Sequence, residues 1–155
     1  MTGRIAARLA ELRITLPAPA RPAGAYVPYV AAGRLVFVSG QLCLWEGKLR
    51  HRGPVGGDVS VDDGREAARV CALNLLAQVR DACGGDLDRV ARVVRLGGFV
   101  QCGSDFVDHP TVLDGASNLM MDIFGEAGRH TRFAVGASSL PRDASVEVDG
   151  IFEID

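Results

Sequence analysis

Residues 130–150, HTRFAVGASSLPRDASVEVDG, place one arginine at the head of an otherwise apolar run. No acidic residue adjoins Arg132 in the sequence. In a β-strand, successive side chains point to opposite faces, so Arg132, Ala134 and Gly136 share one face. These small neighbours leave room beside a guanidinium, whose planar fork matches a carboxylate. Because an unpaired buried cation is costly, Arg132 requires a partner, either an internal acid or a bound anion.

The same stretch predicts two strands, 131–138 and 145–153, around a turn at Leu140-Pro141. In the second strand Glu147 alternates with Val146 and Val148, which places it on the polar or site-facing side. It is either a solvated edge residue, the salt-bridge partner of Arg132, or a carboxylate that passes a proton between water and a substrate.

Upstream, apolar patterning predicts a hairpin within 26–42, joined at Ala32-Gly33, with Ser39-Gly40-Gln41 after its second run. A helix is predicted from the Ser60 cap to Gly84-Gly85, then a short helical turn and a strand within 86–102. A second helix is predicted within 108–129, with Pro110 at its first turn and Gly128 past its end. The order predicts an α+β fold, a two-layer sandwich of two helices on a mixed sheet.

One face of that sheet has no helices left to cover it. We expect small or apolar side chains there, at Val36, Val38, Val94, Ala134 and Gly136, and we expect a homo-oligomer to bury it.

Composition limits the function classes. The 155 residues are 48% hydrophobic and 23% charged, which is typical of one globular domain. A net charge of −2 argues against nucleic acid as a partner, and no apolar stretch approaches the ~20 residues that span a membrane. The four cysteines and three histidines show no metal-ligand or disulfide spacing, so we expect neither a metal site nor a disulfide framework, and a cytoplasmic location.

The N-terminal segment 1–16 is predicted to be an amphipathic helix, as an extension to a single domain at 17–155. Ile5, Leu9 and Leu12 form its apolar stripe. Charged residues interrupt any signal-peptide core, and a mitochondrial transit peptide remains an alternative that Glu11 disfavours.

Taken in order, these stretches resemble the RidA/YjgF family of reactive-intermediate imine deaminases, often labelled L-PSP endoribonucleases. The matching segments are AYVPYVAAGRLVFVSGQ, the Gly-Gly-Asp loop at 56–58, GGDLDRVARVVRLGGFVQCGSDF and TRFAVGASSLPRDASVEVDGI. The resemblance covers roughly residue 24 to the end, and the N-terminal helix suggests a longer-chain subfamily. It implies a chorismate-mutase-like fold, a homotrimer with clefts between subunits, and hydrolysis of 2-imino acids to 2-keto acids and ammonia without a cofactor.

The resemblance also implies roles for single residues. Arg132 corresponds to the arginine that clamps the substrate carboxylate, and Glu147 to the glutamate near the attacking water. Tyr26 corresponds to a tyrosine at the cleft mouth, and Ser39 with Gly40 to ligand contacts at a strand end.

The chain departs from the family pattern around the arginine. Ala134 lines the cleft where a cysteine or serine is common, and His130 is brought close to the cleft, where it either binds an anion or shuttles a proton, or faces solvent. The family's asparagine at the start of the last helix has three alternative matches, Asp114, Ser117 and Asn118.

Three functions therefore compete: an imine deaminase, a non-catalytic trimer that binds a small carboxylate metabolite, and a ribonuclease. The last follows from the family label alone, and the acidic composition disfavours it.

Overall fold

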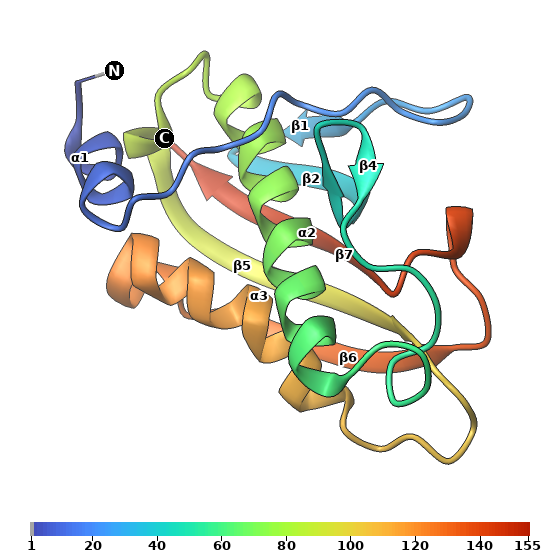
Figure 1. The fold of residues 1–155 in the computed structure, drawn as a ribbon. Coiled ribbons are helices and arrows are strands. Elements are labelled where there is room, and N and C mark those ends of the chain that lie inside the picture. The colour runs from blue at the N-terminus through green and yellow to red at the C-terminus, as the bar shows by residue number, and fades with distance from the viewer. Residues whose placement is uncertain (1) are drawn as a thin grey trace.

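A single mixed sheet with helices on one face forms the body of the protein (Figure 1). The computed structural model describes residues 2–155. The helices are α1 (Arg4–Glu11), α2 (Val61–Ala82) and α3 (His109–Phe124), with 3-10 turns at Leu87–Arg89, Gly125–Gly128 and Pro141–Asp143. The strands are β1 (Tyr29–Ala32), β2 (Leu35–Leu42), β3 (Leu44–Trp45), β4 (Lys48–Leu49), β5 (Val90–Gln101), β6 (Thr131–Ala137) and β7 (Val146–Ile154).

The five long strands are ordered β1-β2-β7-β5-β6. All pairs are antiparallel except β5 with β6, which confirms the α+β class and the mixed sheet. β3 and β4 form a separate small hairpin. The register of β2 against β7 shifts between Val38 and Gln41, so Ser39 and Gly40 lie in a β-bulge.

Local signals set the helix ends close to where the sequence predicts them. The Ser60 hydroxyl accepts a hydrogen bond from the Asp63 N–H at 3.1 Å, and α2 ends just before Gly84 and Gly85, which take positive φ. α3 ends at Phe124 and is followed by Gly125, with φ 61°, and by a 3-10 turn, so Gly128 lies past the end of the helix as predicted.

The N-terminal helix packs into the same core as the rest of the chain. Ile5 and Leu9 are buried, and Asp88 caps the helix from outside, accepting from the N–H of Arg4 at 2.8 Å and of Ile5 at 2.7 Å. These bonds hold the pKa of Asp88 below its usual range. The division of the chain at residues 16 and 17 stays a prediction.

The uncovered face of the sheet differs from the one predicted. Val36 and Val38 point toward the helices and are 0% and 4% exposed, and Ala134 and Gly136 lie on the face of β6 that α3 covers, so placing these four residues on the open face was wrong. Alternation groups residues by face but does not say which group meets the helices. The open face instead presents Val30, Phe37 and Val135, each a large apolar side chain left exposed.

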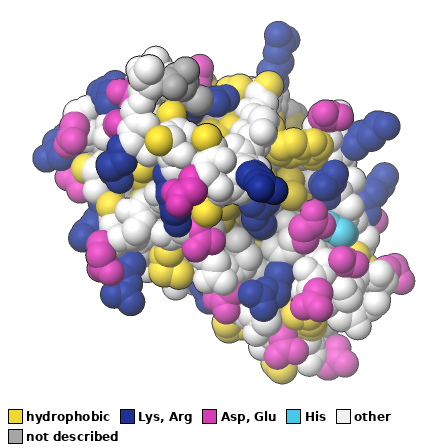
Figure 2. Space-filling view, turned by 60° about the vertical axis from the view of Figure 1, so that its left-hand side comes forward, with side chains coloured by type: hydrophobic (Ala, Val, Ile, Leu, Met, Phe, Trp, Pro, Cys, Tyr) yellow, Lys and Arg dark blue, Asp and Glu magenta, His cyan; other side chains and the backbone are white. Residues whose placement is uncertain are grey.

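Charges of both signs are interspersed over the surface in Figure 2. Among residues 2–155, no helix has the length and apolar character that crossing a bilayer requires.

Candidate functional site

Arg132 extends from β6 toward α3 and finds an internal partner there. Its Nη1 donates to Asp114 Oδ1 at 2.9 Å and to Ser117 Oγ at 3.1 Å, while Nη2 donates to the Pro110 carbonyl at 3.3 Å. The arginine side chain is 20% exposed and that of Asp114 is 48% exposed, so this ion pair is only partly shielded from water. Of the two partners that the sequence left open, the internal acid is present.

The guanidinium nevertheless keeps donors to spare. A guanidinium carries five N–H groups, and the hydrogen bonds of residues 2–155 include none from Arg132 Nε. Nε and the second Nη2 hydrogen lie on one edge of the fork, which is the geometry that a carboxylate takes in a bidentate pair. Ala134, next along the same face of β6, is small enough to leave that edge room.

His130 completes a chain of hydrogen bonds behind Arg132. Its Nδ1 lies 2.7 Å from the Gly128 carbonyl, so Nδ1 carries the proton, and Nε2 accepts from Ser117 Oγ at 2.8 Å. Burial, with a smaller effect from Arg132, lowers the pKa of His130 and favours the neutral imidazole. The solvent-facing alternative for His130 was wrong, because the turn after α3 folds the ring inward.

The three alternatives for the family's asparagine separate clearly. Asp114 and Ser117 lie one helical turn apart on α3 and both face Arg132, whereas Asn118 is exposed. The signal in the sequence was this spacing on a helix, since positions three apart share a face.

Glu147 lies on the opposite side of the sheet from this cluster. Its neighbours Val146 and Val148 are fully buried against the helices, so Glu147 points to the open face. Burial, and secondarily Asp149, raise the pKa of Glu147. The carboxylate lies over Gly40 of the β2 bulge, where a Cβ would come 3.1 Å from Glu147 Cδ.

The other predicted contacts gather around the same bulge. Tyr26 and Gly40 line a small cavity of about 110 Å³. Tyr26 is half-exposed, and its hydroxyl accepts from the Ala23 N–H at 3.3 Å. The Ser39 hydroxyl donates to the Val27 carbonyl at 2.8 Å and so fixes the lead-in to β1.

The predicted site residues therefore form two clusters. The arginine cluster consists of Arg132, His130 and Ala134 with Asp114 and Ser117, and lies between β6 and α3. The glutamate cluster consists of Glu147, Tyr26, Ser39 and Gly40, and lies at the β2 bulge. β5 separates β7 from β6, and the clusters use opposite faces of the sheet, so one chain cannot bring both onto one small substrate.

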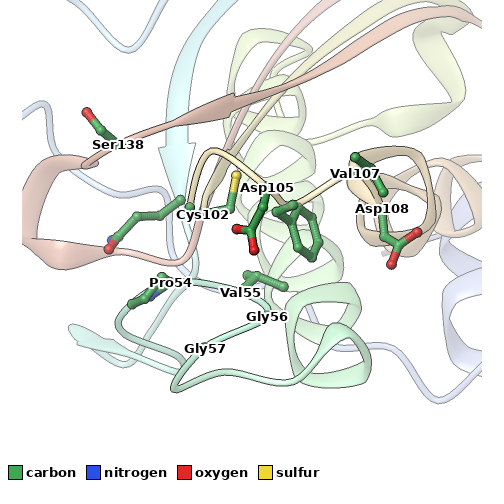
Figure 3. A pocket seen from close by; sticks show the side chains of 12 residues that line it. Pro54, Val55, Gly56, Gly57, Cys102, Asp105, Val107, Asp108 and Ser138 are labelled. Atoms are coloured by element: carbon green, nitrogen blue, oxygen red, sulfur yellow. The ribbon is translucent and has the colours of Figure 1, made fainter.

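A third feature had no signal in the sequence. A cavity of about 550 Å³ opens beyond the ends of β5 and β6, between the loop at 54–57 and the loop at 101–108 (Figure 3). Cys102 lines it, and its Sγ lies 3.4 Å from His109 Nε2 at the start of α3. Gly136 passes close to both groups, and a Cβ there would lie 2.8 Å from Cys102 Sγ.

The thiol of that pair is not primed for nucleophilic catalysis. Burial raises the pKa of Cys102, which disfavours the nucleophilic thiolate. Among residues 2–155, no three His, Cys, Asp or Glu side chains gather as a metal site would require.

A family model matches nearly the whole chain. Residues 6–152 match the family model described as YjgF/chorismate mutase-like, a description that also carries an endoribonuclease label. The match begins inside α1 and includes both clusters.

Individual relatives cover nearly the full chain. Protein TCP17 of Trypanosoma cruzi is 46% identical over 99% of this chain and 96% of its own length. A 2-iminobutanoate/2-iminopropanoate deaminase of Dermatophagoides farinae is 28% identical over 92% of this chain and 95% of its own. The crystal structure of Atu1372 from Agrobacterium tumefaciens, a protein of unknown function, superposes with a TM-score of 0.91 at 49% identity, covering 98% of this chain and 93% of that one.

Proposed function

This chain belongs to the YjgF/chorismate mutase-like family, and from that premise we propose that it hydrolyses small 2-imino acids to 2-keto acids and ammonia. The observation that carries the proposal is the partly satisfied guanidinium of Arg132. It is held rigidly by Asp114, Ser117 and the Pro110 carbonyl, yet keeps a free Nε edge for a second carboxylate. The name of the mite relative supports the choice of substrate class.

Hydrolysis of an imine requires mainly that the substrate and a water be held in the correct orientation. A protonated imine is already electrophilic at carbon, so holding its carboxylate fixes the carbon in front of a water. As the water oxygen bonds to that carbon, the C=N electrons move to nitrogen and Glu147 takes a proton from the water. Glu147 then returns that proton to nitrogen; the hydroxyl proton leaves to solvent as C=O forms, the C–N bond breaks and ammonia departs.

Glu147 suits this relay because of its surroundings. A proton relay works best when its pKa lies near the working pH, and burial moves the pKa of Glu147 in that direction. Its position over Gly40, where a side chain would collide with the carboxylate, keeps the glutamate at the surface of the open face.

The reaction requires a second copy of the chain, because the two clusters face away from each other. We infer a homotrimer in which the open face of one subunit meets the β6 edge of the next. The apolar Val30, Phe37 and Val135 would be buried there. Asp149 Oδ1, on the same face, is buried without a hydrogen-bond partner among residues 2–155, which a donor from the next subunit would satisfy.

The test is the rate of loss of a 2-imino acid made in the assay by an amino-acid oxidase. The wild type is expected to accelerate imine loss, and Arg132→Ala is expected to abolish that acceleration. Arg129→Ala is the matched control, since Arg129 is an exposed arginine three residues away that pairs only with Glu126 among residues 2–155. A wild type with no effect on the imine would refute the activity.

One observation favours a second function, the binding of a carboxylate metabolite without turnover. Asp114 already neutralises Arg132, and Ala134 supplies no polar group beside it. A binding protein would gain thermal stability with a small 2-keto acid, lose that gain in Arg132→Ala, and leave imine lifetimes unchanged.

A further inference from the structure

A second cavity, of about 500 Å³, lies away from the arginine cluster, under the extended lead-in at residues 15–21. Its apolar wall consists of Leu16, Pro17, Leu44 and Trp45. Its volume falls in the range of sites that hold small organic molecules.

The walls of this lead-in cavity are fixed in place before any ligand binds. Gln78 of α2, 1% exposed, donates from Nε2 to the Ala20 carbonyl at 2.7 Å and so holds the lead-in against the helix. Asn74, one turn earlier on α2, donates to the Leu44 carbonyl at 2.8 Å and holds β3. Trp45 pairs with Lys48 across the tight β3–β4 turn, which leaves the indole half-buried beside the cavity.

Two polar groups of this cavity have bonding capacity left over. Asn74 is 2% exposed; its Nδ2 is occupied by backbone carbonyls, and the hydrogen bonds of residues 2–155 include none to its Oδ1. Oδ1 is therefore free to accept a hydrogen bond from a ligand N–H or O–H in the cavity. Arg21, at the rim, is exposed and forms no ion pair with the residues that the structure describes.

From these contacts we propose that the lead-in cavity is a binding site for a small aromatic carboxylate. The ring would pack between Trp45 and the Leu16-Pro17 wall, a ligand donor would reach Asn74 Oδ1, and the carboxylate would pair with Arg21 at the rim. The site does not rest on the proposed deaminase function, since it shares no residue with the arginine cluster.

Trp45 is the only tryptophan in the chain, so its fluorescence reports on the two cavities that it borders, the lead-in cavity and the neighbouring one beside Arg13. The probe is 4-hydroxyphenylacetate, which carries a ring, a hydroxyl donor and a carboxylate. We expect a saturable change in Trp45 emission, with 4-methylphenol, which lacks the carboxylate, binding about ten-fold more weakly because one charge-assisted hydrogen bond is lost.

Variants locate the binding. Arg21→Gln is expected to weaken binding of the probe about ten-fold and to leave binding of 4-methylphenol unchanged. The substitution should not perturb folding, because exposed side chains away from packed features contribute little to stability. Arg13→Gln, at the neighbouring surface, and Arg132→Ala should both leave the titration unchanged. No saturable change in Trp45 emission, equal affinity for the neutral probe, or loss of binding in Arg132→Ala but not in Arg21→Gln would each overturn the proposal.

Discussion

At the scale of single residues, the main finding is that Arg132 already holds a carboxylate. Asp114 is one of the three residues that could match the family's asparagine, and its Oδ1 lies 2.9 Å from Arg132 Nη1. In the proposed reaction, a bound substrate would therefore share the guanidinium with a resident charge. Asp114 positions Arg132 and at the same time weakens its attraction for a second anion.

Replacing Asp114 with asparagine should strengthen the clamp. Asp114→Asn keeps an oxygen that accepts from Arg132 Nη1 but removes the competing charge, so kcat/KM for a 2-imino acid should rise about five- to ten-fold. Steady-state kinetics on the oxidase-coupled assay measure the change. Ser117→Ala removes a neutral partner and serves as the control; an unchanged or lower kcat/KM in Asp114→Asn would mean that the charge is needed.

The raised pKa of Glu147 predicts how the stability of the fold depends on pH. Its folded-state pKa is raised above its ordinary value of 4.5, so in the folded protein the ionised form is disfavoured relative to the unfolded chain. Its contribution is most favourable below pH 4.5 and is lost as the pH rises through the raised folded-state pKa. Glu147→Gln should therefore unfold at higher denaturant concentration than the wild type at pH 7, with the difference shrinking toward pH 4. A difference that is the same at both pH values would contradict the raised pKa.

At the scale of secondary-structure elements, the contact of α2 with α3 depends on one glycine. Gly115 of α3 lies against the backbone of Arg65 in α2, and a Cβ on Gly115 would collide with the Arg65 carbonyl oxygen. This close approach allows α3 to present Asp114 and Ser117 to β6.

Gly115→Ala should destabilise the fold even though alanine is the better helix former. Alanine gains about 1 kcal/mol of helix propensity, but separating two packed backbones costs about 1–3 kcal/mol or more, so the net change is a loss. Chemical denaturation measures it. Asn118→Ala, on the exposed face of the same helix, should be neutral or slightly stabilising; a stabilised Gly115→Ala variant would show that the two helices separate easily.

The sequence predicts such elements well where local chemistry decides them. Ser60, Gly84 and Pro110 mark helix ends because capping and backbone restrictions act within a few residues. The partner of Arg132 could not be chosen in the same way. Asp114 lies 18 residues earlier on another element, and only the packing of α3 against β6 brings the two together.

At the scale of the whole molecule, long-range packing also decides which face of the sheet the helices cover, and local sequence does not reveal it. Alternation separated Arg132 from Phe133, but which face meets the helices depends on the packing of all five strands. Two alternating patterns in the sequence thus looked like one site, and the fold places them on opposite sides. The proposed homotrimer, with clefts between subunits, would bring the two clusters together.

The open face should be the subunit interface. Phe37→Glu places a charge among the exposed apolar side chains of that face, so it should convert a trimer to monomers, with deaminase activity lost as well. Sedimentation velocity measures the change in mass. Val107→Glu is the control, since Val107 is 77% exposed on a loop away from the sheet; a wild type that is already monomeric would refute the interface.

The most direct test of the central claim, that Arg132 and Glu147 act together across a subunit boundary, is complementation between two inactive variants. Arg132→Ala and Glu147→Gln are unfolded together, refolded as a mixture, and assayed for imine hydrolysis. In random trimers about a quarter of the clefts would pair an intact Arg132 with an intact Glu147 from the next subunit, so about a quarter of wild-type activity should return. If both variants are inactive alone and the refolded mixture stays inactive while a refolded wild type recovers, the two residues do not share a cleft between subunits.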